Sequence, residues 1–381
     1  MKKNHFKAVH GPIIMLLSFV AMLVMQLVMA FALIGTGATE GELYEILNCV
    51  GMILFQLVYV AVYLLYTQKN KIFSTFSPKN KISLLGIAVS VAVTLVCFFG
   101  FIGLAYYFEY LLSNVGYVGA TLDVTTPIGI ALLVVATVVA APIGEETIFR
   151  SALCSGLVKN RKDDLGVCLI SGVCFALMHI NPSQTVYQLC LGAASAYVML
   201  KGRSVIYAMV MHALSNALAL IVSFTSLGVG VEAFYVQTGE SVWITLLTCV
   251  VLPVVAVTLV WLIGRCFKRY ETKRLPAKYK GEPKIIWIDE ITKEPIFEGE
   301  DAPVITEQNR TFQRGFNPYT GKPVMVDRIE LQNALREEYY QNNNEKSGLF
   351  GKNTYKIVFC IYFVITIFMW LLTFISGFNV V

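Results

Sequence analysis

The sequence predicts an all-α protein, a polytopic bundle of about nine transmembrane helices with a small cytoplasmic insertion before the last helix. Hydrophobic residues make up 56% of the 381-residue chain and charged residues 14%, against roughly 25% charged residues in soluble domains. Apolar runs of about 20 residues, enough to cross a hydrocarbon core of about 30 Å, recur along the chain. This composition is typical of a membrane-embedded protein and makes membrane lipid the first expected partner.

Nine apolar runs are predicted to be membrane spans. They are Ile13 to Ile34, Leu47 to Tyr66, Ile82 to Tyr106, Ile128 to Val158, Leu165 to Ile180, Thr185 to Leu200, Val205 to Leu227, Val242 to Gly264 and Ile357 to Ser376. The first run exceeds the roughly 7 to 15 residues of a signal-peptide core, which favours a retained helix. Lys and Arg follow spans two, four and six, whereas the alternate loops carry Glu and Asp. The positive-inside rule therefore predicts that the N-terminus is cytoplasmic and that the C-terminus lies outside. We expect an integral protein of the plasma membrane.

Ionisable side chains inside these spans are few and gather in one region. They are Glu145, Glu146 and Arg150 in the fourth span, with His179 and His212 in or at the ends of later spans. Such residues are costly in lipid and usually functional. Pro142 can open a new helical segment, in which Glu146 and Arg150 are i,i+4 neighbours suited to pair. Glu145 then faces another side of the helix and is free to act.

Residue counts from the predicted cytoplasmic turns place side chains of three spans at a similar depth. Glu145 and His179 each lie about 14 residues, or about 21 Å, from the turn at Lys159 to Asp164. His212 and Asn216 are i,i+4 on the seventh span and project from one helical face. We therefore expect a Glu, two His and an Asn to meet in one layer within the membrane.

Three short motifs in this region resemble those of a known family. They are Glu145-Glu146-Thr-Ile-Phe-Arg150 (EExxxR), Phe175-Ala-Leu-Met-His179 (FxxxH) and His212-Ala-Leu-Ser-Asn216 (HxxxN). Their order resembles that of the CPBP family of intramembrane proteases, the type II CAAX prenyl endopeptidases and bacteriocin-processing Abi enzymes. The resemblance covers about Ile128 to Leu220, roughly a quarter of the chain. It implies an intramembrane endopeptidase, a hydrolase acting on a peptide or lipidated protein substrate.

Family similarity also implies roles for single residues. Glu145 and His179 would activate a water, and His212 and Asn216 would steady the oxyanion, which suits a carboxylate, an imidazole and an amide donor. Glu146 and Arg150 would form a buried structural pair. One Glu and two His are also the ligand set of a catalytic zinc. The enzyme is thus glutamate-dependent without a required cofactor, or a metalloprotease with zinc on Glu145, His179 and His212.

The spans and the resemblance predict five regions. They are an N-terminal three-span region (1–127), a CAAX-protease-like catalytic core (128–227), an eighth span (228–266), a cytoplasmic polar insertion (267–354) and a C-terminal span (355–381). The insertion begins with a basic stretch, Arg265 to Lys284, beside the membrane. Within it, Asp289 to Phe297 and Asn317 to Val324 share a Thr and a Pro at a spacing of 28, which indicates either two hairpin-like units or a chance match.

Two other classes of membrane protein are compatible with intramembrane Glu and His. One is a noncatalytic bacteriocin-immunity or scaffolding protein, and the other is an ion-coupled transporter. A transporter is expected to show polar residues along several spans, whereas here they concentrate at one depth. The sequence therefore favours the enzyme, with a peptide or lipidated protein as partner and no nucleic acid.

Overall fold

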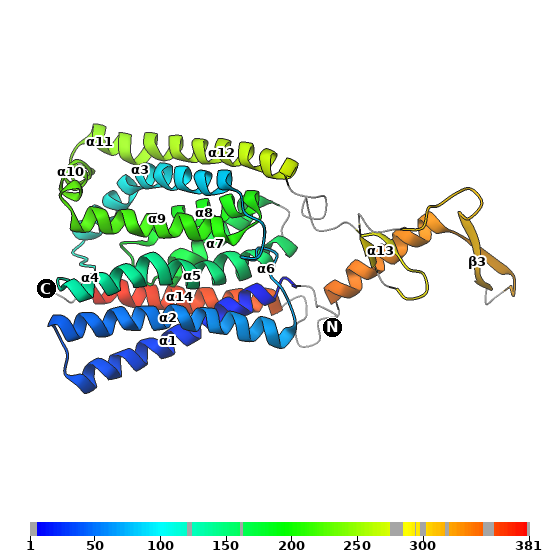
Figure 1. Cartoon of the computed structure of the whole chain (residues 1–381), viewed down its shortest axis with the longest axis horizontal. Helices are drawn as coiled ribbons and strands as arrows, with labels where there is room; N and C mark the ends of the chain where they lie inside the picture. The colour runs from blue at the N-terminus through cyan, green and yellow to red at the C-terminus, as the bar shows by residue number, and fades with distance from the viewer. Residues whose placement is uncertain are drawn as a thin grey trace. The chain divides into compact units, whose positions relative to one another are not determined.

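Figure 1 shows the computed structural model of the chain, which describes residues 6–119, 124–160, 163–274, 285–293, 295–297, 302–316, 320–345 and 354–378. The chain divides into two compact units. The first contains Met1–Lys268 and Tyr355–Val381, and the second contains Arg269–Thr354. The first unit is a helix bundle that contains all three motifs.

Helices of the bundle occupy the positions of all nine predicted spans. They are α1 (His10–Thr36), α2 (Gly41–Asn70), α3 (Leu84–Asn114), a segmented helix made of α4 (Pro127–Val134), η1 (Val135–Ala140), α5 (Ala141–Glu146), η2 (Thr147–Leu153) and α6 (Cys154–Asn160), then α7 (Asp164–Met178), α8 (Thr185–Gly202), α9 (Val205–Phe224), a second segmented helix made of α11 (Val242–Leu246), η3 (Leu247–Val251) and α12 (Leu252–Arg274), and finally α14 (Thr354–Ser376). Among the described residues, seven helices are long and apolar enough to cross a membrane. The polytopic all-α membrane fold is therefore confirmed.

The helices α7 and α8 are not among these seven, because α7 has only 15 residues and α8, with 18 residues, is less apolar. They pack as an antiparallel hairpin whose close approach depends on glycine. A Cβ atom on Gly172 would lie 2.8 Å from the carbonyl oxygen of Leu189, and one on Gly192 would lie 3.1 Å from the Cα atom of Gly172. Small residues of this kind let two helix backbones approach closely inside a membrane. The hairpin therefore brings the end of α7, with His179, into the interior of the bundle.

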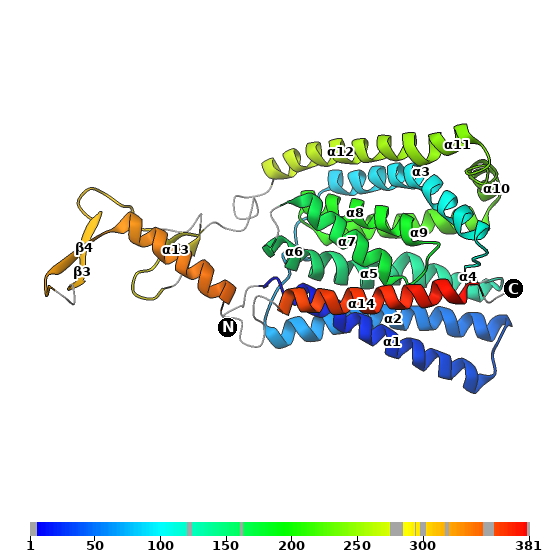
Figure 2. The same ribbon diagram turned by 180° about the vertical axis from the view of Figure 1, so that it is seen from behind.

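The first and last helices of the bundle are α1 and α14. α1 begins and α14 ends at opposite ends of the bundle, as both views show (Figures 1 and 2). α14 packs on the α7–α8 hairpin, where the Tyr362 hydroxyl donates to the carbonyl of Cys174 at 2.7 Å and Trp370 Nε1 donates to Thr185 Oγ1 at 2.8 Å. One further helix, α10 (Ser226–Tyr235), occupies a segment that the sequence analysis left as the end of a span and a loop. It is separate from α9 because the backbone at Thr225 is extended.

The second unit contains two antiparallel hairpins and one helix. β1 (Ile285–Ile288) pairs with β2 (Pro295–Phe297), β3 (Thr311–Phe316) pairs with β4 (Pro323–Asp327), and α13 spans Arg328–Glu345. The Thr and Pro that the two stretches share lie at the two hairpins. In both turns the residue directly after the shared Thr has a positive φ, 59° at Lys293 and 64° at Gly321. Residues 317–319 of the second stretch and residues 275–284 of the basic stretch lie outside the described residues.

Candidate active site

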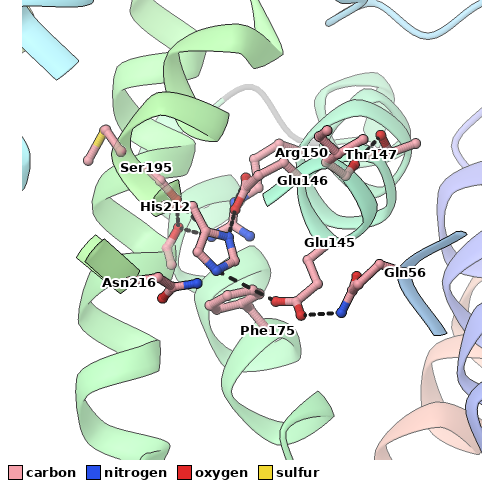
Figure 3. Close-up of polar contacts among 12 residues, drawn as sticks. Gln56, Glu145, Glu146, Thr147, Arg150, Phe175, Ser195, His212 and Asn216 are labelled. Carbon is pink, nitrogen blue, oxygen red and sulfur yellow. Dashed lines mark hydrogen bonds and ion pairs between the residues drawn. The ribbon is translucent and has the colours of Figure 1, made fainter. Parts of the chain in front are cut away.

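The ionisable side chains of the three motifs meet where α5, α7 and α9 pack together. Oε2 of Glu145 lies 3.8 Å from Nε2 of His179 and 3.9 Å from Nε2 of His212. His212 is 3% exposed and Glu145 is 13% exposed, whereas His179 is 20% exposed. The structure thus brings together three predicted site residues from three helices, and His179 is the most accessible of them. Figure 3 shows Glu145 and His212 facing each other.

Glu146 lies beside this trio and bridges His212 and Arg150. Its Oε2 lies 3.1 Å from Nε of Arg150, so the pair predicted from the i,i+4 spacing is present. Its Oε1 lies 2.9 Å from Nδ1 of His212, a contact that the sequence analysis did not anticipate. Glu146 is 1% exposed and Arg150 is fully buried. The carboxylate therefore joins the first motif to the third in addition to pairing with Arg150.

Arg150 extends the same network to α8. Its Nη2 donates to the carbonyl of Gly192 at 3.0 Å and to Oγ of Ser195 at 2.7 Å. The guanidinium carbon also lies 4.3 Å from the centroid of the Phe175 ring, within the range of a cation–π contact. A Cβ atom on Gly192 would lie 3.2 Å from Nη2, a tight contact, so glycine leaves room for the guanidinium. These contacts compensate for burying a charge in the bundle.

The tautomers of both histidines follow from their hydrogen bonds. Nδ1 of His179 lies 2.8 Å from the carbonyl oxygen of Phe175, and since a carbonyl only accepts, Nδ1 carries the proton. Nδ1 of His212 donates to Glu146 in the same way. In the neutral rings, both Nε2 atoms therefore present lone pairs toward Glu145. The Phe175 ring packs edge-on against both imidazoles, at centroid distances of 4.8 and 5.5 Å.

The backbone takes an unusual conformation just after α7, at the residue that follows His179. Ile180 has φ of 50°, in the left-handed region that β-branched residues rarely adopt. Such a residue costs on the order of 1–3 kcal/mol and persists only where its surroundings enforce it. Ile180 is partly buried against the hydrophobic core that contains Phe175. This packing fixes the position at which the helix ends and so fixes the position of His179.

Asn216 lies one turn beyond His212 and makes a contact that its motif did not reveal. Its Nδ2 donates to the backbone carbonyl of Thr137 at 2.7 Å. In η1 the hydrogen bonds run from residue i+5 to residue i, as from the N–H of Ala141 to Ala136. The next carbonyl, Thr137, would accept from residue 142, but Pro142 has no N–H. Asn216 therefore satisfies a carbonyl that Pro142 leaves free, and its second amide hydrogen remains available to a ligand.

Sequence reasoning missed Gln56 altogether. It lies on α2, is 6% exposed, and donates from Nε2 to Oε1 of Glu145 at 2.9 Å (Figure 3). The available signal was an amide in the middle of the span Leu47 to Tyr66, whose other amide, Asn48, lies at its start. Ser195 was missed for a different reason, because a serine in a membrane helix is too common to stand out.

The donor types at the site match zinc, but the separations are wide. Among the described residues, no group of three or more His, Cys, Asp and Glu side chains is arranged to hold a metal ion. Two ligands in a tetrahedral zinc site with bonds near 2.0–2.1 Å are about 3.3 Å apart. The separations of 3.8 and 3.9 Å around Glu145 Oε2 exceed that value. Zinc binding by Glu145, His179 and His212 requires these side chains to move inward by a few tenths of an ångström.

Comparison with known proteins found one family model whose match includes all three motifs. Residues 127–218 match the family model Rce1-like, described as type II CAAX prenyl endopeptidase Rce1-like. Neither the curated proteins nor the solved structures gave a match. The resemblance to type II CAAX prenyl endopeptidases is thereby confirmed, over about a quarter of the 381 residues. The chain is an integral membrane protein that carries the segment characteristic of a protease family.

Proposed function

We propose that this protein is an intramembrane endopeptidase that hydrolyses a peptide bond in a membrane-associated peptide or a lipidated protein. The observation that carries the proposal is the convergence of Glu145, His179 and His212 inside a helix bundle, with 3.8 and 3.9 Å between the carboxylate oxygen and the two ring nitrogens. These distances exceed a direct hydrogen bond and suit contacts mediated by one water. A water held at this place has a carboxylate and an imidazole beside it.

The first step is attack of this water on the substrate carbonyl. Glu145 Oε2 takes a proton from the water, and His179 Nε2 accepts a hydrogen bond from its other O–H. His179 is the more exposed of the two histidines, so it is well placed to exchange a proton with the departing amine. The proton taken at attack is delivered to that amine when the C–N bond breaks.

The second requirement is stabilisation of the negative charge on the carbonyl oxygen. His212 Nε2 is a donor when the ring is doubly protonated, and the Glu146 carboxylate at Nδ1 holds the ring in place. Asn216 contributes its second amide hydrogen, since the first is committed to Thr137. Glu146 and Arg150 act as a buried structural pair that holds His212 in place. If zinc is bound by Glu145, His179 and His212, it supplies Lewis-acid polarisation of the water or the carbonyl.

Comparison of membrane peptides from cells that express wild type, Glu145→Ala and Glu145→Gln tests the proposal. We expect cleavage products with wild type but with neither Glu145 variant, because both variants lack the proton acceptor. Thr36→Ala is a matched control, since its hydroxyl bonds only to carbonyls of its own helix. Identical peptide profiles in wild type and Glu145→Ala, with equal amounts of folded protein, would instead favour a scaffolding or immunity role.

A further inference from the structure

The candidate active site extends beyond the segment that matches the protease family. Gln56 lies on α2, outside residues 127–218, yet its amide reaches the proposed catalytic carboxylate at 2.9 Å. A buried amide that loses its water costs free energy unless it is hydrogen-bonded. Within a membrane span such a side chain is expected to be functional. The contact with Glu145 accounts for the presence of Gln56 in an apolar helix.

α2 runs parallel to the segmented helix from α4 to α6. Polar residues on one face of α2 contact that helix and the residues just before it. Near its start, Glu45 accepts the backbone N–H groups of Thr125 and Thr126 at 2.9 and 3.0 Å. Further along, Tyr63 contacts Ser151 at 3.3 Å. Glu45, Gln56 and Tyr63 are 11 and 7 residues apart, which is about three and two helical turns, so they share one face. Gln56 therefore belongs to a continuous interface along the site helix.

Gly144 allows α2 to approach at this point. A Cβ atom on Gly144 would lie 2.3 Å from Oε1 of Gln56 and 2.9 Å from its backbone oxygen. Nothing larger than glycine fits without moving Gln56 or the helix. Gly144 directly precedes Glu145, so the glycine and the amide together define where the carboxylate can lie.

We propose that Gln56 is a positioning residue for the active site. Its donation to Oε1 of Glu145 fixes the rotation of the carboxylate about its last bond, so that Oε2 points toward His179 and His212. This inference rests on the proposed function, because it assigns Glu145 as the group that is positioned. It makes α2 part of the catalytic unit, which then comprises more than the family segment.

Kinetics of purified enzyme in detergent or nanodiscs, with a cleavable membrane peptide from the comparison above, test the role. Gln56→Met keeps the volume and removes the donor, and Gln56→Glu replaces the donor by a second carboxylate. We expect kcat to fall about 10- to 100-fold in Gln56→Met, as for other groups that orient a catalytic side chain, with KM within twofold. The matched control is Asn48→Leu, since Asn48 is also on α2 but donates to the carbonyl of Tyr44 in its own helix. Wild-type kcat in Gln56→Met, with Glu145→Ala inactive, would overturn the inference and leave the proposed function intact.

Cross-linking tests the geometry without any activity. Gln56→Cys combined with Glu145→Cys is expected to form a disulfide under mild oxidation, identified by peptide mass mapping. Gln56→Cys combined with Glu146→Cys is the control, because Glu146 points toward His212 and Arg150. Equal yields from both pairs, or no disulfide from the first pair, would overturn the inference even if the protein proves not to be a protease.

Discussion

Oε1 of Glu146 lies 2.9 Å from Nδ1 of His212, across a separation of 66 residues in the chain. This contact connects the first motif to the third, and the ion pair with Arg150 connects the same carboxylate to α8. Two adjacent glutamates thus serve different purposes. Glu145 faces the two Nε2 atoms, and Glu146 holds the opposite side of one of the rings.

Replacement of Glu146 is expected to affect folding before chemistry. Glu146→Ala leaves Arg150 buried without its carboxylate, which costs about 3 to 5 kcal/mol. We expect a strong loss of folded protein, measured by size-exclusion chromatography and thermal unfolding in detergent. The double variant Glu146→Ala with Arg150→Met removes both charges and is expected to be more stable than Glu146→Ala alone. Additive losses in the double variant would show that the two side chains do not stabilise each other.

Asn216 is predicted to have two separable effects. Asn216→Ala removes the proposed oxyanion donor, and we expect kcat to fall about 100- to 1,000-fold. It also leaves the carbonyl of Thr137 without a partner, at a cost of about 1 to 3 kcal/mol in stability. Adding Pro142→Ala restores a backbone N–H in that turn, so the double variant is expected to regain stability without regaining turnover. Wild-type kcat in Asn216→Ala would remove Asn216 from the catalytic mechanism.

The sequence predicted the helices and the motif residues well because both are local properties. A run of apolar residues predicts a span whatever its neighbours are, and i,i+4 spacing predicted the contact of Glu146 with Arg150. Contacts between distant helices follow from packing. Gln56 meets Glu145 across 89 residues because Gly144 leaves space for it, and no periodicity encodes that meeting. The free carbonyl of Thr137 likewise depends on the π-helical register before Pro142.

Metal dependence is best tested by removal and direct analysis together. If the water is activated by Glu145 and His179 alone, exhaustive chelation should leave full activity, and purified protein should contain no stoichiometric zinc. If zinc is required, chelation should stop cleavage reversibly, and His179→Ala or His212→Ala should abolish bound metal. Elemental analysis of both variants beside wild type distinguishes these outcomes. We expect the first result, because Asn216 is a poor zinc ligand yet lies one turn from His212 on the same face.

The close approach of α2 to the site helix predicts an unusually sensitive glycine. Gly144→Ala places a methyl group 2.3 Å from Oε1 of Gln56, so the helices must separate or the amide must leave Glu145. Overpacking of this kind costs about 1 to 3 kcal/mol. We expect lower thermal stability and lower kcat. Gly35→Ala is the control, since a Cβ atom on Gly35 meets nothing within 4 Å and Ala favours a helix. Equal behaviour of the two variants would contradict the tight contact.

The alternating basic loops predict the orientation of the chain in the membrane. The second unit is expected in the cytoplasm, and the turn between α10 and α11 is expected outside. Ser347, within the predicted cytoplasmic insertion, would be one labelling site but lies outside the described residues. The exposed residues Gln308, in the second unit, and Gln237, in that turn, are better sites. With a membrane-impermeant maleimide, Gln237→Cys should react in intact cells, whereas Gln308→Cys should react only after permeabilisation. The unsubstituted protein corrects for its native cysteines, of which Cys266 and Cys360 are exposed. Labelling of Gln308→Cys in intact cells would reverse the predicted orientation, and with it the expectation that the N-terminus is cytoplasmic.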